Sequence, residues 1–125
     1  MDCNLQDQKN VMLMDAVNNG SIPMIDLMLS NGADINHICN NDSKVFNCLK
    51  VKGTTPLTLS ILIGNITIVR HLIDNNADIN KPDDNGFFPI VVASRNGKYH
   101  IVEYLLNYSE VISNIDNLFI LEKSK

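Results

Sequence analysis

Apolar residues recur at a helical spacing in the middle of the chain. Between positions 66 and 75 they stand at i, i+1, i+4 and i+5, which places them on one face of a helix. The residues on this face are Ile68, Val69, Leu72 and Ile73. Another apolar run covers residues 56–63, and Gly64-Asn65 provides a tight turn between the two. The pattern predicts two short helices, the first ending at about residue 63 and the second covering about residues 66–75.

Three landmarks of this two-helix unit return 33 residues later in the chain. They are the run 68–73, which returns as 101–106, and Pro56 and Gly64, which return as Pro89 and Gly97. The segment GADIN at 32–36 returns as NADIN at 76–80, at an offset of 44 residues, so about 11 extra residues separate the first two copies. A period of this length predicts a stack of repeats that bury one another's apolar faces.

Residues at the predicted helix ends favour the same boundaries. The Thr55 hydroxyl can cap the first helix of the second copy, and Pro56 fits its first position because the missing N–H would be unpaired there in any case. The residue that ends the second helix must adopt a left-handed conformation, for which Gly is best and Asn next. Gly32 and Asn76 occupy that position, whereas the third copy has Ser109, so we expect its ending to be looser.

These motifs resemble the ankyrin repeat family. The second copy follows the family's pattern through one whole repeat, from GTTPL at 53–57 through Gly64 to ADIN at 77–80. The other residues that carry the resemblance are Leu13, Ala16, Gly20, Leu27, Leu29 and 32–36 in the first copy, and 83–86, Pro89, Ile90, Ala93, Gly97, 101–102 and 105–106 in the third.

The chain departs from the family's pattern mainly in its outer copies. Phe88 replaces the Thr of the Thr-Pro pair in the third copy, and Val11-Met12 replaces the whole pair in the first. Thr58 and Val91 stand where the family usually has His, and SEVIS at 109–113 has lost the GADIN form. These departures predict weaker helix caps at both ends of the stack.

The resemblance implies an all-α fold, a right-angled L-shaped solenoid of about three helix–turn–helix repeats with β-hairpin fingers. We expect a single domain over residues 1–125, in which 114–125 form either a half-repeat that caps the stack or the start of a longer array. The predicted repeats cover about 11–36, 53–80 and 86–113, with a long finger insertion at 37–52.

Composition and charge narrow the classes of partner. A formal net charge of −4 disfavours nucleic acids and anionic membranes, which attract basic proteins. The polar N-terminus does not resemble a signal peptide, and the apolar stretch 57–73 is too short and broken to span a bilayer. Three cysteines, an odd number, suggest reduced thiols. We therefore expect a cytoplasmic protein, with the nucleus left open.

Neither catalysis nor metal binding has a strong motif. A nucleophilic site needs an oriented base, but we expect His71 and His100 to be surface or edge residues, and no Walker-type phosphate loop occurs. His37, Cys39 and Cys48 offer ligands that zinc prefers, although their spacing does not match structural zinc modules. A Cys39–Cys48 disulfide is not expected in a reducing compartment. The sequence therefore predicts neither an enzyme nor a metal or other cofactor.

The resemblance instead implies a protein partner, of unstated identity, on the concave face and fingers, with no small-molecule substrate. Carried over by position, the contact residues are Val51, Lys52, Thr54, Leu62, Ile63, Asp84, Asn85, Phe87, Arg95 and Asn96, together with Asn18 and Asn19 in the first copy. Neighbouring exposed apolar groups tend to mark interaction sites, and Phe87 beside Arg95 suits a hot spot. Alternatively, the long finger covers Leu62 and Ile63 and makes them part of the core.

The functional prediction is therefore a protein-interaction module, working as an adaptor, scaffold or inhibitor. The alternative is a structural spacer, or a fragment of a longer ankyrin array, with no partner of its own.

Overall fold

The computed structural model describes residues 5–39 and 53–113 of the chain. Within these residues the regular structure is entirely helical, with six helices in order and a further helical segment at 109–113. The helices are α1 (Leu5–Asn19), α2 (Ile22–Ser30), α3 (Pro56–Ile63), α4 (Ile66–Asp74), α5 (Pro89–Arg95) and α6 (Tyr99–Leu105). The all-α prediction is confirmed. The expected β-hairpin fingers are not seen, because the described part of the chain contains no strand.

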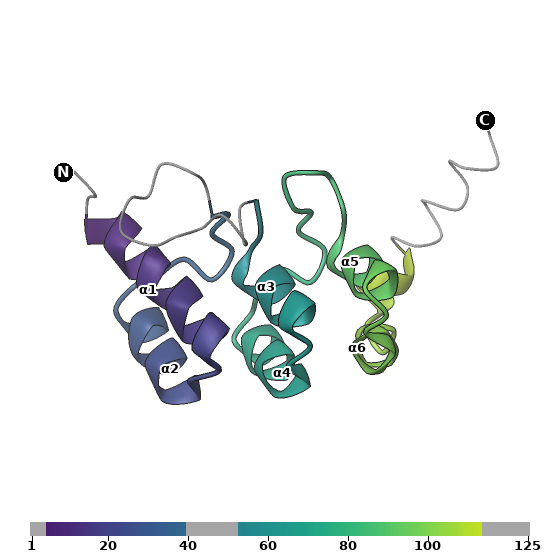
Figure 1. Cartoon of the computed structure of the whole chain (residues 1–125), viewed down its shortest axis with the longest axis horizontal. Helices are drawn as coiled ribbons and strands as arrows, with labels where there is room; N and C mark the ends of the chain where they lie inside the picture. Colours follow the sequence, from purple (N-terminus) through teal and green to yellow (C-terminus); the bar gives the residue numbers. More distant parts are fainter. Residues whose placement is uncertain (1–4, 40–52, 114–125) are drawn as a thin grey trace.

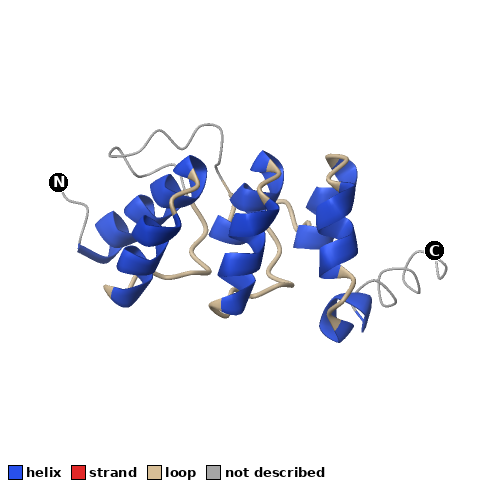
Figure 2. Ribbon diagram, turned by 90° about the horizontal axis from the view of Figure 1, so that it is seen from below, coloured by secondary structure: helices blue, strands red, loops and turns tan. Residues whose placement is uncertain are grey.

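The helices form three antiparallel pairs that stand side by side. Figure 1 shows α1, α3 and α5 in one row, each with its partner α2, α4 or α6 beneath it. In the view from below, the three pairs follow one another in chain order (Figure 2). The predicted stacking of successive two-helix units is therefore present.

The ends of α3 and α4 agree with the sequence prediction. The Thr55 hydroxyl accepts a hydrogen bond from the Thr58 amide at 3.1 Å, and Pro56 is the first residue of α3. Gly64 ends α3 in the left-handed conformation, with a φ of 84°. Asn76 has a φ of 73° and is the only non-glycine residue with positive φ in the described segments. Its position is the one where a left-handed residue was predicted.

The middle helix α3 is buried on nearly all sides because a repeat packs against each of its faces. Residues 56–61 are all buried, and two of them, Thr58 and Ser60, are polar. Ser60 donates its hydroxyl hydrogen to the Leu57 carbonyl at 2.7 Å, so burial leaves that donor satisfied. The equivalent residues Leu13, Leu57 and Ile90 of the three repeats are 5% exposed or less, and together they form a continuous core along the stack.

The loops between repeats are joined to one another by backbone hydrogen bonds. The Cys39 amide donates to the Thr54 carbonyl at 2.9 Å, and the Gly53 amide donates to the Cys39 carbonyl at 2.7 Å. The Asp84 amide of the third repeat donates to the Gly53 carbonyl at 3.0 Å. The loops at this edge are therefore held in series without forming a regular sheet.

Asparagine side chains add a second link between neighbouring units. Asn36 accepts a hydrogen bond at its Oδ1 from the Asp78 amide of the next repeat, at 2.8 Å. Asn80 occupies the equivalent place one repeat later, but its Oδ1 is buried without a partner. Its Nδ2 instead donates to the Glu110 carbonyl at 3.0 Å. The series ends there because residues 109–113 form a helical segment rather than the GADIN-type loop.

The first repeat receives the same link from an unusual source. Asn10, on α1, accepts a hydrogen bond at its Oδ1 from the Asp34 amide at 2.7 Å. Asn10 therefore does for Asp34 what Asn36 does for Asp78. The side chain can reach that site because α1 begins seven residues before the position at which α3 begins in the second repeat.

Neither helix of the third repeat has a side-chain cap at its N-terminus, and for α5 the sequence predicts this. Phe88 is the N-cap residue of α5 and makes no side-chain hydrogen bond there. Of the predicted finger insertion 37–52, only residues 37–39 are described, and the predicted terminal segment 114–125 lies outside the described residues.

Replacing Thr55 by Ala should lower the free energy of unfolding by about 1 kcal/mol, since the Thr58 amide loses its capping acceptor. Urea denaturation followed by circular dichroism measures this change. Thr67→Ala is the matched control, because Thr67 is exposed in α4 and its substitution should change the stability by less than about 0.5 kcal/mol. Equal effects of the two substitutions would show that Thr55 does not cap α3.

Candidate functional site

The predicted contact residues on the first helix of each repeat lie at equivalent places. They are the last two residues before the glycines that begin the interhelical turns, Gly20, Gly64 and Gly97. Because α1, α3 and α5 stand side by side, these positions form a row across the three repeats (Figure 1). We call it the turn row, and it consists of Asn18, Asn19, Leu62, Ile63, Arg95 and Asn96.

The two apolar members of the turn row differ in exposure. Leu62 is partly buried and packs against the core, whereas Ile63 is 43% exposed. The four remaining members are exposed polar or charged residues. An isoleucine is thus presented to solvent between asparagines on one side and an arginine on the other. Among the described residues nothing covers Ile63, and the finger that was proposed as its cover lies largely outside them.

Phe87 is a support for Arg95 rather than a freely exposed anchor. Its ring is partly buried against the core, and the Arg95 guanidinium carbon lies 4.3 Å from the ring centroid. The loop that carries Phe87 is fixed by Asp83, whose Oδ1 accepts hydrogen bonds from the Phe87 and Asn85 amides, each at 2.9 Å. The Arg95 guanidinium is therefore held in one position by stacking on the face of the Phe87 ring.

The remaining predicted contact residues do not form one surface. Thr54 is 6% exposed and offers little area to a partner, whereas Asp84 and Asn85 are exposed in the loop before α5. Val51 and Lys52 lie outside the described residues. The described part of the candidate site is therefore the turn row together with Phe87 and the tip of its loop.

Sequence reasoning missed Lys98, which follows the turn glycine of the third repeat. Its Nζ lies 3.3 Å from the place that a Cβ on Gly64 would occupy. The ammonium group thus lies beside the end of α3, close to Ile63. From the sequence, the Gly97-Lys98 pair was interpreted only as a turn. Asn65 makes the same kind of contact one repeat earlier, with its Nδ2 3.3 Å from the place that a Cβ on Gly20 would occupy. Comparison of the repeats could have revealed this contact.

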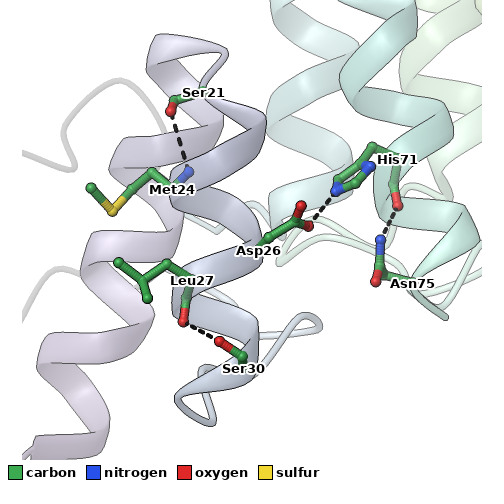
Figure 3. A network of polar contacts seen from close by, with 7 residues as sticks. All are labelled: Ser21, Met24, Asp26, Leu27, Ser30, His71 and Asn75. Carbon is green, nitrogen blue, oxygen red and sulfur yellow. Dashed lines mark hydrogen bonds and ion pairs between the residues drawn. The ribbon is translucent and has the colours of Figure 1, made fainter.

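On the second helices, polar groups join neighbouring repeats. His71 and Asp26 contact one another at 2.6 Å between Nε2 and Oδ1, as shown in Figure 3. Met24 and Leu27 point away from this contact. One repeat later, Arg70 lies 5.3 Å from the centre of the Tyr104 ring. These residues therefore serve the stacking of repeats, in agreement with an edge position for His71.

Tyr104 also pairs with Tyr108 through an edge-to-face contact, with the two hydroxyl oxygens 3.0 Å apart. Burial, followed by this hydrogen bond, raises the pKa of Tyr104 to about 12. The Tyr104 hydroxyl therefore stays protonated at neutral pH.

The residues considered for a metal site have other partners. Asn10 directs its Oδ1 to the Asp34 amide, so its Nδ2 faces the His37 Nδ1 at 3.4 Å and donates to it. The expectation of reduced thiols is wrong for Cys39, which is disulfide-bonded. That expectation rested on the odd number of cysteines and on a polar N-terminus unlike a signal peptide, and neither observation excludes a disulfide. No cluster of three or more metal-binding side chains occurs within 5–39 and 53–113.

The stacked helix pairs, their caps and the repeated turn glycines agree with a family comparison. The model for ankyrin repeats (3 copies) matches residues 13–116, which is most of the chain. The chain belongs to the ankyrin repeat family. Ankyrin repeats generally serve as protein-interaction modules rather than as catalysts.

Curated relatives with ankyrin-type similarity are much longer than this chain. It is 33% identical over 82 residues to ankyrin repeat and SAM domain-containing protein 6 of Rattus norvegicus, a match that covers 65% of this chain and 9% of the relative. It is 27% identical over 100 residues to alpha-latrocrustotoxin-Lt1a of Latrodectus tredecimguttatus, covering 79% and 6%. It is 29% identical over 82 residues to potassium channel AKT3 of Oryza sativa subsp. japonica, covering 66% and 8%.

The three relatives have names that indicate different roles, so the likeness points to no common activity. No helix in the described part of this ankyrin chain has the length and apolar character needed to cross a membrane.

Lowering the pH should destabilise the protein through His37. Burial lowers the pKa of His37 below its ordinary value of 6.5, outweighing the nearby carboxylates of Asp34 and Asp7, which act in the opposite direction. The unfolded chain then binds the proton more readily than the folded one. The contribution of neutral His37 is complete above pH 6.5 and is lost as the pH falls from 6.5 towards the lowered folded pKa.

Urea denaturation at pH 7.5, 6.5 and 5.5 tests this expectation. As the pH is lowered, the free energy of unfolding of the wild type should fall more steeply than that of His37→Gln. The glutamine side chain can still accept a hydrogen bond from Asn10 but does not titrate. Parallel pH profiles for the two proteins would contradict the assigned role of His37.

Proposed function

We propose that this chain is a protein-binding module that engages its partner through the turn row and the neighbouring tip of the loop at 84–87. The observation that carries the proposal is the exposed Ile63, which sits at 43% exposure in the centre of a row of polar and charged residues. Binding is favoured when a partner removes an apolar side chain from water, and the surrounding polar groups can orient the partner through hydrogen bonds.

The arrangement supports binding rather than chemistry. His71 and His37 are already engaged with Asp26 and Asn10. Neither is paired with a nucleophilic side chain in the described segments, as a catalytic base would have to be. A role as an adaptor, scaffold or inhibitor is compatible with this surface. The surface gives no reason to favour one of the three roles.

A segment of a longer ankyrin array is the second candidate. Met24 on α2 is 39% exposed, whereas Ile68, which occupies the same place in the second repeat, is 1% exposed. The chain also spans less than a tenth of each relative described above. A preceding helix pair would cover Met24. Asp15 argues against a preceding helix pair. It is exposed at the position where the later repeats bury Leu59 and Val92, and a preceding pair would also bury its carboxylate.

Affinity capture with the purified chain as bait, from an extract of the organism that produces it, tests the proposed module. Ile63→Ser should reduce recovery of the partner about tenfold, since burial of an isoleucine contributes about 1.5–3 kcal/mol. Met24→Ser is the matched control, because Met24 is similarly exposed but lies outside the turn row.

Phe87 and Leu62 are less suitable targets because both pack against the core and their loss would also weaken the fold. Unfolding curves should show that both serine variants keep the stability of the wild type. Equal recovery with Ile63→Ser and the wild type would rule out the turn row as the binding surface. Loss with Met24→Ser alone would favour the longer array.

A further inference from the structure

Arg95 is held in place while its hydrogen-bond donors stay available. The guanidinium lies over the Phe87 ring at 4.3 Å, and Phe87 is itself fixed by the core and by the Asp83 carboxylate. A guanidinium stacked on an aromatic ring keeps the donors at its edge directed outward, and these donors match the two oxygens of a carboxylate. Less conformational entropy is then lost when a partner binds.

No carboxylate of the described chain neutralises this arginine. The ion pair found within residues 5–39 and 53–113 joins His71 to Asp26 on the second helices. Asp83 uses its Oδ1 for two loop amides, and Asp84 lies against Gly53 on the loop side. Arg95 is exposed, and Lys98 adds a second positive charge at the end of α3. Among the described residues, neither of these two cations on the turn side forms an ion pair with an acid.

The cations adjoin the exposed apolar part of the turn row. Arg95 occupies the position in α5 that Leu62 occupies in α3, and Ile63 follows Leu62. Packed helices stand about 8–10 Å apart. A peptide in the polyproline II conformation rises about 3.1 Å per residue with three residues per turn, so residues i and i+3 point the same way about 9 Å apart. Such a peptide matches the expected spacing of neighbouring repeats, one of which carries Ile63 and the next Arg95.

We propose that the turn row binds a peptide segment that carries a Glu or Asp about three residues from an aliphatic side chain. The aliphatic side chain packs on Ile63 and the exposed part of Leu62, and the carboxylate receives hydrogen bonds from Arg95 with Lys98 beside it. The asparagines of the first repeat contact the peptide backbone. The inference rests on the proposed function and adds to it the chemistry of the partner.

An acidic peptide fits these observations better than a nucleic acid. Two cations release few counterions, and the chain as a whole has a formal net charge of −4. The single aliphatic contact at Ile63 also suits a peptide side chain. Asp83 and Asp84 lie in the loop before α5, and Glu103 lies on α6, so the peptide carboxylate is expected beside Arg95 on the turn side.

Selection from a phage-displayed library of random 16-residue peptides on the immobilised full chain tests the proposal. The enriched peptides should share an acidic residue about three positions from Leu, Ile or Val. A fluorescein-labelled peptide made from the enriched sequence should bind Arg95→Gln about 10- to 100-fold more weakly than the wild type, as expected for loss of charge-assisted hydrogen bonds. Arg95→Lys should fall between the two.

Arg70→Gln is the matched control. Arg70 is also exposed and stacked, on Tyr104, but it lies on the second helices, so its loss should change the affinity less than twofold. Helical circular dichroism and urea midpoints of all variants should show that the fold is retained.

The outcomes separate this inference from the proposed function. Enriched peptides that lack an acid but lose affinity with Ile63→Ser would overturn the inference and leave the binding module intact. Binding of the acidic peptide to Arg95→Gln as tightly as to the wild type would have the same consequence. Failure to enrich any peptide, or enrichment that Ile63→Ser does not affect, would overturn both. Tighter binding of a fluorescein-labelled 20-nucleotide single-stranded DNA than of the enriched peptide would overturn the inference in favour of a nucleic acid.

Discussion

Burial of one helix pair by the next is the constraint on which the rest of the structure depends. A helix of seven or eight residues is too short to be stable alone in water, and α5 and α3 have these lengths. Each becomes stable because its neighbours cover it, as the buried series Leu13, Leu57 and Ile90 shows. The middle repeat is covered on both sides, so even its polar residues Thr58 and Ser60 lose contact with water.

The same constraint decides where a surface is left for recognition. The core occupies the helix faces that point along the stack, so the ends of α1, α3 and α5 beside the turns remain accessible. The turn row has different side chains in each repeat, although the backbone is nearly the same. The first repeat presents two asparagines, the second an aliphatic pair, and the third an arginine with an asparagine. The scaffold does not itself determine specificity, which depends on the side chains that the repeats present in this row.

Local sequence patterns predicted those features that depend on one or two turns of chain. The ends of α3 and α4, the Thr55 cap and the left-handed Asn76 were all predicted because their causes lie within a few residues. The sequence placed Phe87 beside Arg95 but did not predict that the ring is partly buried and supports the guanidinium, because this depends on how the loop before α5 packs on the core. The disulfide of Cys39 was also not predicted. Asn10 shows the same limit. Its side chain accepts a hydrogen bond from a backbone amide 24 residues away, and in the sequence alone it looks like any polar residue of a helix.

Because of the contacts between the second helices, one repeat cannot be exchanged for another without changing the interface with its neighbour. Asp26 meets His71 across the first interface, and Arg70 meets Tyr104 across the second, so each side chain is matched to the repeat that follows it. An array built by duplicating the second repeat in tandem would bring the Arg70 of one copy against the His71 of the next. Such a junction would exchange an attractive contact for one between a guanidinium and an imidazole. Engineers who recombine these units would therefore have to choose neighbours as well as units.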